Sequence, residues 1–276
     1  MKKIFITGAS SFLGRRVIQK FTDYEFTSLT NINDISLSNV TNIKINNYDE
    51  LKSIFKKENF EHVFHFASQR HVPDDIVDIQ KYIDVNLILG TKLIEASNNS
   101  NVKTFVYSGS LWQDLFNPAD NLYTISKQHF EDYLEYISHE ASFKVLALRI
   151  GDLYGKDDFR NKLIPYIKKN EDMKNIDFNS NGEHLLSPVH IDDVISAIEA
   201  KIFQNPLIPF ERVRLCSKPL TIKEFVGIYK ATREKNFNAI YGNLINNSFT
   251  KKDFKQRVNK NIWKNEIDIL DGLKNL

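Results

Sequence analysis

Short apolar runs alternate with longer amphipathic segments over the first two thirds of the chain. The runs have the length and composition of buried strands, and the segments between them repeat apolar residues at helical spacing. The pattern predicts strands over 3–7, 62–66, 104–107 and 144–148, and helices over 14–21, 48–57, 79–97 and 123–138. Strands that are apolar throughout and separated by helices are typical of a parallel sheet covered on both faces. The predicted fold class is therefore α/β, with a doubly wound parallel sheet.

A glycine-containing turn joins the first predicted strand to the first predicted helix: Gly8-Ala9-Ser10-Ser11-Phe12-Leu13-Gly14. Gly8 permits a tight turn, and Gly14 lets the helix lie close against the strand. The free N–H groups and the dipole at the start of the helix favour a bound pyrophosphate. Ser11 stands where a middle glycine is usual, and we expect its hydroxyl to donate to phosphate. A turn of this kind between a strand and a helix predicts a dinucleotide-binding Rossmann fold.

A further strand is expected to end near Leu29, and the residues that follow it bear on the choice of cofactor. An acidic residue there would bind the ribose 2′-OH of NAD. The sequence has Thr30 and Asn31 at this point, with no acid before Asp34. Arg15 and Arg16, just inside the first helix, can reach a 2′-phosphate. The sequence therefore favours NADP (as NADPH) over NAD.

The character of the sequence changes after residue 155. Basic, asparagine-rich and aromatic segments with less regular periodicity follow. A helix starting at Asp192 and a strand at 212–216 are expected to return the chain to the main sheet. We predict a dinucleotide-binding domain over 1–155 and 189–216, and a smaller substrate-binding lobe over 156–188 and 217–276.

Tyr123 and Lys127 are four residues apart, so they share one face of a predicted helix. A nearby cation stabilises the phenolate and so prepares the tyrosine for proton transfer. Such a tyrosine can donate a proton to a carbonyl as hydride arrives, or remove one from an alcohol in reverse. Upstream, Ser110 follows a predicted strand, where its hydroxyl can polarise the same carbonyl.

Further motifs occur in a fixed order along most of the chain. They are Thr7-Gly8…Gly14, His65-Phe66-Ala67-Ser68, Val85-Asn86, Ser108-Gly109-Ser110, Tyr123…Lys127, Leu148-Arg149 with Leu153-Tyr154-Gly155, and Val189-His190-Ile191-Asp192-Asp193-Val194. An ordered set of motifs is more specific than any one of its members. With this set, the sequence resembles the extended short-chain dehydrogenases/reductases, in their sugar-nucleotide epimerase/dehydratase branch.

The resemblance implies roles for individual residues. Ser110, Tyr123 and Lys127 would form the catalytic triad. The cofactor would contact Gly8, Ser10, Ser11, Phe12, Leu13, Gly14, Arg15, Thr30, Asn31, Asn46, Phe66, Ala67, Ser68, Ser108, Tyr123, Lys127, Ile150 and Leu153. Asn46 or Asn47 would replace the acidic residue that commonly contacts adenine. The substrate would contact Asn86, Ser110, Leu111, Trp112 and Arg149.

The residues after Ser110 separate the reactions of this family. Its dehydratases carry adjacent Asp and Glu after the catalytic hydroxyl, whereas Leu111 and Trp112 stand there in this chain, which argues against dehydration. Segment 108–113 resembles the sugar-nucleotide 4-ketoreductases, such as CDP-abequose and CDP-paratose synthases. This resemblance implies an NADPH-dependent reduction of the C4 ketone of a nucleotide-diphospho-4-keto-6-deoxyhexose. Such a reaction belongs to deoxysugar biosynthesis for O-antigen and other surface polysaccharide.

Two alternatives stay open. The first is a nucleotide-sugar epimerase that retains NAD and oxidises then re-reduces one substrate, against which the absence of an acid at Thr30 argues. The second is a non-catalytic dinucleotide sensor, which would have no need for the proton donor Tyr123 or for Ser110 and Lys127.

Composition narrows the class of protein. The net charge of +2 is too small to indicate nucleic-acid binding. A single cysteine, Cys216, excludes an intramolecular disulfide and a cysteine-based zinc site, and it favours a reducing, cytoplasmic compartment. No apolar stretch approaches the roughly 18 residues of a membrane helix. His62 and His65 would point to opposite faces of a strand, so we expect no metal. The family resemblance implies a homodimer through the helices near Asn86 and Tyr123.

Overall fold

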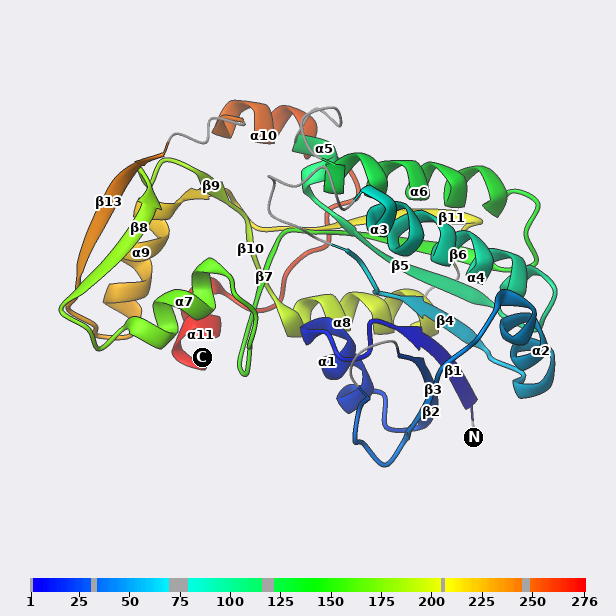
Figure 1. The fold of residues 1–276 in the computed structure, drawn as a ribbon. Helices are drawn as coiled ribbons and strands as arrows, with labels where there is room; N and C mark the ends of the chain where they lie inside the picture. Colours follow the sequence, from blue (N-terminus) through cyan, green and yellow to red (C-terminus); the bar gives the residue numbers. More distant parts are fainter. Residues whose placement is uncertain (1, 31–33, 70–78, 116–121, 205–206, 245–248) are drawn as a thin grey trace. The chain divides into compact units, whose positions relative to one another are not determined.

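A computed structural model describes residues 2–30, 34–69, 79–115, 122–204, 207–244 and 249–276 (Figure 1). The chain divides into two compact units, each with its own hydrophobic core. The first unit comprises Met1–Gln113, Asn117–Arg149 and Ile198–Val213, and the second comprises Asp114–Phe116, Ile150–Ala197 and Arg214–Leu276.

Seven strands form the main sheet. They are β1 (Lys2–Thr7), β2 (Tyr24–Leu29), β3 (Val40–Ile43), β4 (His62–His65), β5 (Thr104–Ser110), β6 (Lys144–Ile150) and β11 (Phe210–Leu215). Their order in the sheet is β11-β6-β5-β4-β1-β2-β3, and the strands from β3 to β5 pair in parallel. The predicted α/β class with a doubly wound parallel sheet is confirmed.

Helices cover both faces of this sheet. They are α1 (Phe12–Lys20), α2 (Tyr48–Glu58), α3 (Ile79–Ile83), the π-helical turn η2 (Asp84–Ile88), α4 (Leu89–Asn98) and α6 (Leu122–Ser138). The helices α2, α4 and α6 share a core with the strands that includes Phe5, Leu51, Phe55, Leu93 and Phe130. Burying one such phenylalanine stabilises the fold by about 1.5–3 kcal/mol. The helix α1 lies on the opposite face of the sheet (Figure 1).

The strand order reverses between β1 and β4. The chain passes from β1 through β2 to β3 on one side, and then crosses to β4 on the other side of β1. In open α/β sheets the crevice at the carboxyl ends of such neighbouring strands is where ligands bind. The expected ligand site therefore lies beside the residues that follow Thr7 and His65. These two residues are register partners at the carboxyl ends of β1 and β4.

In the described part of the second unit there are three two-stranded sheets and several short helices. The strands are β7 (Asp152–Tyr154), β8 (Asn175–Ser180), β9 (Leu185–Leu186), β10 (Pro188–His190), β12 (Leu220–Thr221) and β13 (Asn238–Leu244), paired as β7 with β10, β8 with β13 and β9 with β12. Its helices include α7 (Leu163–Asn170), α9 (Ile222–Thr232), α10 (Lys251–Arg257) and α11 (Ile269–Lys274).

Three further helical segments complete the part of the chain that the structure describes: α5 (Trp112–Leu115), α8 (Ile191–Glu199) and η4 (Ala200–Gln204). Within the described ranges, every helix is too short or too polar to cross a membrane.

Candidate active site

Gly8 follows β1 in a conformation that favours glycine. Its φ is +72°, and a Cβ atom there would lie 2.5 Å from the backbone nitrogen of Ala67 and 2.6 Å from the carbonyl carbon of Phe66. A Cβ atom on Gly14 would lie 2.3 Å from the carbonyl oxygen of Gly8. Side chains are therefore excluded at both glycines, and the bare backbone of this turn fits the pyrophosphate of a dinucleotide.

Ser11 is the N-cap of α1. Its Oγ accepts a hydrogen bond from the Gly14 N–H at 3.0 Å, and its own N–H donates to the Gly8 carbonyl at 3.0 Å. The cap explains why α1 begins at Phe12, two residues earlier than the sequence predicted. Because Oγ accepts in the cap, the hydroxyl proton is left to donate, as the predicted phosphate contact requires.

The other residues predicted on this turn divide between core and surface. Phe12 and Leu13 are buried, whereas Arg15 and Arg16 are exposed. Arg15 Nε donates to the carbonyl of Ser10 at 3.1 Å, so its guanidinium group lies beside the turn.

A hydroxyl and a carboxylate meet at the end of β2. Thr30 Oγ1 donates to Asp34 Oδ1 at 2.8 Å, and Thr30 is buried while Asp34 is exposed. The acid that comes four residues late in the sequence is thus brought back to the strand end. Asn31, predicted here as a cofactor contact, lies outside the described residues.

Asn46 and Asn47, predicted near adenine, lie exposed between β3 and α2. The backbone and side-chain N–H groups of Asn46 donate to the Glu50 carboxylate at 2.9 and 3.2 Å. Asn47 Oδ1 caps α2 by accepting from the N–H groups of Asp49 and Glu50. Both side chains therefore shape the start of α2.

A buried polar chain links the carboxyl ends of β1 and β4. Thr7 Oγ1 lies 2.7 Å from His65 Nδ1 and accepts from the Ala67 N–H at 3.3 Å. Burial lowers the pKa of His65 to about 3, so the ring is neutral at physiological pH and shares one hydrogen bond with the threonine hydroxyl. This chain holds Phe66 and Ala67 against Gly8, and so brings together three residues predicted to bind the cofactor.

Lys127 is buried near the start of α6, with 2 % of its surface exposed. Its Nζ donates to the Ser108 carbonyl at 2.8 Å, and lies 4.8 Å from the centre of the Tyr107 ring and 5.9 Å from that of Tyr123. Burial lowers the pKa of Lys127 to about 7, and the Glu131 carboxylate one turn later opposes this shift. The predicted tyrosine–lysine pair is thus brought to the carboxyl end of β5.

Ser110 is the last residue of β5 and is buried. Its Oγ accepts from the Trp112 N–H at 3.3 Å, and its backbone N–H donates to Gln113 Oε1 at 2.8 Å. Since the Oγ atom accepts from Trp112, the hydroxyl proton can be donated to a carbonyl oxygen. The end of β5 therefore carries both Ser110 and the carbonyl that holds Lys127.

Asn86 lies in the π-turn η2, between α3 and α4. Its Nδ2 donates to the Gln69 carbonyl at 3.1 Å and to Ser126 Oγ at 2.9 Å, and its Oδ1 accepts from the Gln69 N–H at 2.7 Å. Ser126 in turn donates to the Tyr123 carbonyl at 2.9 Å. Asn86 therefore ties the segment after β4 to the first turn of α6. Single π-turns of this kind are frequent at functional sites.

A buried carboxylate on α6, Glu131, was not predicted from the sequence. It accepts from Arg149 Nε at 3.1 Å and a terminal Arg149 nitrogen at 2.8 Å, from Gln113 Nε2 at 2.8 Å, and from Arg212 Nε. The guanidinium of Arg149, predicted as a substrate contact, is therefore engaged within the first unit. The available signal was spacing, because Glu131 lies one turn after Lys127 on the same helix face.

The remaining predicted site residues differ in burial and in the unit to which they belong. Leu111 is buried, Trp112 is half-buried and Ser68 is exposed. Ile150 and Leu153 belong to the second unit, at the end of β6 and within β7.

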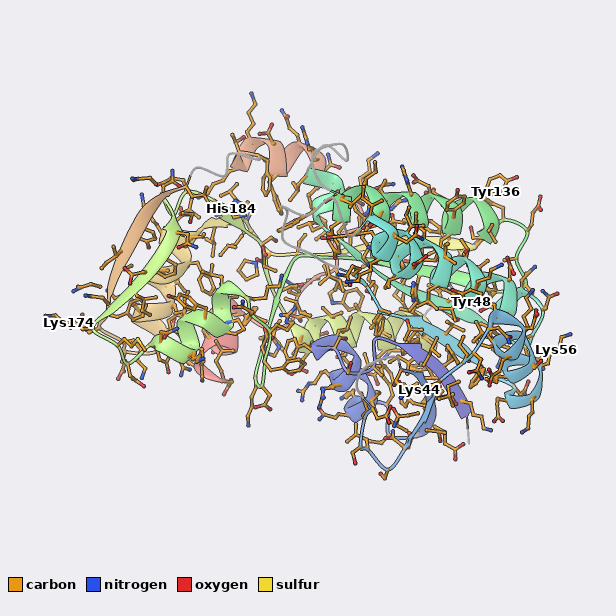
Figure 2. The ribbon with its side chains drawn as sticks, in the orientation of Figure 1. Lys44, Tyr48, Lys56, Tyr136, Lys174 and His184 are labelled. Atoms are coloured by element: carbon orange, nitrogen blue, oxygen red, sulfur yellow. The ribbon has the colours of Figure 1, made fainter. Side chains whose placement is uncertain are left out.

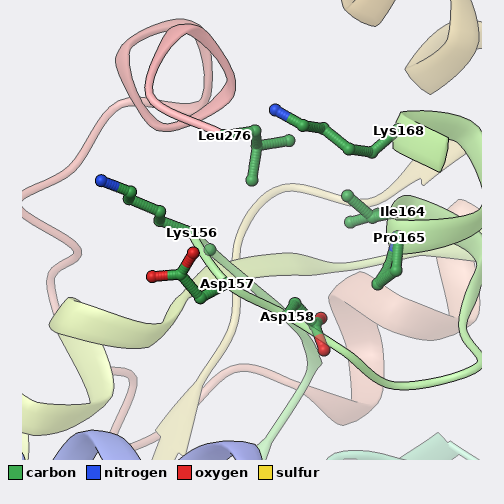
Figure 3. Close-up of a pocket in the computed structure, with 8 residues that line it drawn as sticks. Lys156, Asp157, Asp158, Ile164, Pro165, Lys168 and Leu276 are labelled. Atoms are coloured by element: carbon green, nitrogen blue, oxygen red, sulfur yellow. The ribbon is translucent and has the colours of Figure 1, made fainter.

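The second unit has a cavity of its own, of about 390 Å³ (Figure 3). Its lining combines cations and carboxylates: Gly155, Lys156, Asp157, Asp158, Ile164, Pro165, Lys168 and Leu276. None of the residues predicted to bind cofactor or substrate is among them.

Side chains that could bind a metal are scattered among the described residues. Within those residues, His, Cys, Asp and Glu nowhere gather in a group of three or more that could hold a metal. His62 contacts Tyr24 with ring centres 6.0 Å apart, and His65 contacts Phe130 at 5.4 Å. The two histidines thus pack among different aromatic groups, and His71 lies outside the described residues.

This chain is similar to known proteins both in sequence and in fold. The chain is 21% identical over 295 residues to the CDP-abequose synthase of Salmonella typhimurium, covering 99% of this chain and 96% of that one. Among solved structures, UDP-glucose 4-epimerase of Thermotoga maritima with UDP-glucose superposes with a TM-score of 0.77 at 19% identity, covering 99% and 96% of the two chains. MoeE5 in complex with UDP-glucuronic acid and NAD gives a TM-score of 0.79 at 16% identity, covering 99% and 97%.

A family model matches most of the chain. The model of the NAD dependent epimerase/dehydratase family aligns with residues 4–205. That range begins in β1 and includes the glycine turn, the π-turn and the segment from Ser110 to Lys127. The chain therefore belongs to the NAD-dependent epimerase/dehydratase family, and it is an enzyme of the NAD(P)-dependent oxidoreductase type.

Proposed function

We propose that this enzyme reduces the C4 ketone of a nucleotide-diphospho-4-keto-6-deoxyhexose, with NADPH as the reductant. The observation that carries the proposal is the buried Lys127 beside Tyr123, at the strand end that also holds Ser110. A ketone needs only a hydride and a proton to become an alcohol, and this set of groups suits delivery of the proton. The match to CDP-abequose synthase along nearly the full length of both chains supports the choice of substrate class.

In this proposal the chain's own residues bind the substrate carbonyl and supply the proton. The Tyr123 phenol donates a proton to the ketone oxygen as the C4 carbon is reduced. The Ser110 hydroxyl donates a hydrogen bond to the same oxygen, while its Oγ is held by the Trp112 N–H. The Lys127 ammonium stabilises the phenolate left behind, and solvent returns the proton to Tyr123.

The glycine turn supplies the dinucleotide site in this proposal. Gly8 and Gly14 present bare backbone, and the capped start of α1 presents N–H groups suited to a pyrophosphate. NADPH bound there supplies the hydride. Phe66 and Ala67, held against Gly8 by the Thr7–His65 chain, would line the same site.

Two features at the ribose end bear on NADPH against NADH. The exposed Arg15, beside the turn, favours a 2′-phosphate, whereas the Asp34 carboxylate next to Thr30 favours a 2′-OH. We propose NADPH as the preferred cofactor. Arg15→Ala should then raise the KM for NADPH about tenfold and leave that for NADH unchanged, and Asp34→Asn should lower the KM for NADPH. An Arg15→Ala variant with unchanged NADPH kinetics would contradict the preference.

A second candidate function is a nucleotide-sugar 4-epimerase that retains NAD. The Asp34 carboxylate favours it, because an acid at this strand end suits the NAD ribose. An epimerase returns the hydride to its own substrate and therefore consumes no external cofactor.

The deciding experiment follows nicotinamide absorbance with the purified protein and freshly prepared CDP- or dTDP-4-keto-6-deoxyglucose. We expect stoichiometric loss of NADPH with formation of the reduced sugar. Isomerisation of UDP-glucose or another nucleotide sugar without net cofactor loss would instead establish the epimerase. Inactivity in both assays would contradict both candidates.

We further propose that the enzyme is a homodimer through α3 and α6. Large apolar side chains are exposed on these helices, including Ile79 at 41%, Ile83 at 36%, Tyr133 at 53% and Tyr136 at 78%. Figure 2 shows Tyr136 projecting outward from α6. Large apolar groups exposed on neighbouring helices are a feature of protein interfaces.

Light scattering tests the dimer. Wild type should have twice the mass of the chain, and Tyr133→Lys with Tyr136→Lys should give a monomer. Met173→Lys, an exposed apolar position in the second unit, should leave the mass unchanged and serves as the matched control. A monomeric wild type would refute the dimer.

A further inference from the structure

We propose that Gln113 is a positioning residue for Ser110, and that it fixes the serine by bridging its backbone to the buried Glu131. The inference rests on the proposed function, because it assigns Ser110 a part in the reaction. Gln113 lies outside the set of Ser110, Tyr123 and Lys127, and its role is to position Ser110.

Both ends of the Gln113 amide are engaged. Oε1 accepts from the Ser110 N–H at 2.8 Å, and Nε2 donates to Glu131 Oε2 at 2.8 Å and to Gln128 Oε1 at 3.4 Å. One neighbour is a donor and the other two are acceptors, so the amide has one orientation that satisfies all three. The side chain is buried, with 6 % of its surface exposed, so water does not compete freely for these bonds.

Gly109 provides the space for this bridge. A Cβ atom on Gly109 would lie 2.7 Å from Gln113 Oε1 and 3.2 Å from Glu131 Oε2. Any larger residue between Ser108 and Ser110 would therefore push the amide away from the serine N–H. The absent side chain is thus a requirement of the bridge, and it explains a glycine inside a strand, where glycine is otherwise unfavourable.

The far end of the bridge is rigid. Glu131 is fully buried on α6 and is held by the guanidinium groups of Arg149 and Arg212, from β6 and β11. A network in which each polar group has partners restricts the positions of its members. Gln113 therefore connects Ser110 to an anchor that spans three elements of the first unit.

For the reaction, the Gln113 bridge would serve to orient Ser110. Ser110 ends β5, where the regular strand pairing stops, and its Oγ accepts a 3.3 Å bond from the Trp112 N–H. Fixing the serine backbone at this point fixes the position of Cβ, from which the Trp112 N–H bond then orients the hydroxyl. Misplacement of a reacting group by about 1 Å can cost about 100-fold in rate.

The test is a double-mutant cycle on the full chain. Gln113→Met removes all three hydrogen bonds of the amide at nearly constant volume, and we expect kcat to fall about 10- to 100-fold with little change in KM or dinucleotide affinity. In a Ser110→Ala background, the same substitution should have almost no further effect on kcat, because Gln113 acts through Ser110. Equal losses in both backgrounds, or no loss in the wild-type background, would overturn the proposal. Gln256→Met, at an exposed position in the second unit, is the matched control and should keep full activity.

A second variant gives a pH signature that a loss of packing would not produce. Gln113→Glu keeps an acceptor for the Ser110 N–H but places a carboxylate against Glu131, and only the protonated acid can restore the donor. Activity relative to wild type should therefore rise as the pH is lowered from about 8 to 6, whereas the relative activity of Gln113→Met should stay constant. A ratio for Gln113→Glu that does not change with pH would contradict the bridge.

Amide hydrogen exchange separates this inference from the proposed function, because it needs no substrate. Gln113→Met and Gly109→Ala should each accelerate exchange of the Ser110 amide at least tenfold, while the amides of Phe105 to Tyr107 stay protected. If the wild type reduces no 4-keto sugar but this acceleration is seen, the function fails and the bridge stands. Unchanged Ser110 exchange in both variants would overturn the bridge itself.

Discussion

The Nζ atom of Lys127 lies 5.9 Å from the centre of the Tyr123 ring, one helical turn further along α6. The same atom donates to the Ser108 carbonyl, which ties this turn of the helix to the end of β5. A cation held in this way cannot follow the phenol if the phenol moves. The pair is therefore preorganised for proton transfer, and its members can be tested one at a time.

Removing the phenolic oxygen tests the proton donor. Tyr123→Phe should lower kcat at least about 100-fold, because general acid catalysis contributes about 10²–10⁴ to the rate. Cofactor affinity, measured by fluorescence titration, should be nearly unchanged. Tyr133→Phe changes an exposed tyrosine on the same helix and should keep wild-type turnover. Wild-type turnover in Tyr123→Phe would exclude this residue as the acid.

The lowered pKa of Lys127, about 7, predicts a pH dependence in the free enzyme. The group is a cation below this pKa and neutral above it, so kcat/KM for reduction should fall as the pH rises through about 7. Lys127→Arg keeps its charge at any accessible pH, and its residual activity should lack this alkaline limb. A wild-type profile that is flat from about pH 6 to 8.5 would show that the charge is not required.

Alanine should be tolerated at Gly227 but not at Gly8. Gly8→Ala places a Cβ atom 2.5 Å from the Ala67 nitrogen at a φ of +72°, so it should abolish dinucleotide binding and lower the melting temperature. Gly227→Ala on α9 meets nothing within 4 Å and should stabilise the fold by about 0.5–1 kcal/mol. Thermal melts and cofactor titrations on both variants check this. Equal melting temperatures and equal cofactor affinities in the two variants would contradict the predicted steric clash at Gly8.

His62 predicts acid sensitivity of the fold. Burial lowers its pKa to about 4, below the value of about 6.5 expected in the unfolded chain. Its contribution to stability is therefore complete above about pH 6.5 and declines by up to about 1.4 kcal/mol per pH unit as the pH falls towards 4. His62→Phe keeps an aromatic ring beside Tyr24 and Phe203 and should flatten this decline in urea unfolding.

The matched control for this substitution is His139→Phe, at an exposed position after α6. It should leave the dependence of the unfolding free energy on pH as in wild type. The same slope in His62→Phe and wild type between about pH 6.5 and 4 would show that His62 does not carry the effect.

Much of the first unit follows from sequence because its signals are local. The strand β1 contains the uninterrupted apolar run Ile4-Phe5-Ile6, and α6 is long enough to show a clear helical period. The turn from Gly8 to Gly14 is specified by backbone sterics that only glycine satisfies. The pairing of Tyr123 with Lys127 needs only the geometry of one helix.

Other features depend on contacts that no local pattern carries. Gln113 and Glu131 meet across 18 residues of chain, and Arg212 joins them from 81 residues beyond Glu131. The Asp34 carboxylate accepts a hydrogen bond from Thr30, a contact that the spacing of the two residues did not reveal. In the second unit, strands of two residues such as β9 and β12 are too short to produce a periodic signal.

The π-turn at Asp84–Ile88 bears on how a relative with one residue fewer at this point would fold. An i→i+5 turn accommodates one more residue than an α-helical turn, so deleting a single residue there would restore a regular helix. The flanking helices α3 and α4 would keep their faces, because the extra residue is taken up within the turn, and only the residues of the turn itself would move. Asn86 would leave Gln69 and Ser126, and the helix itself would persist. A relative shorter by one residue at this point would therefore keep the fold and lose this link between β4 and α6.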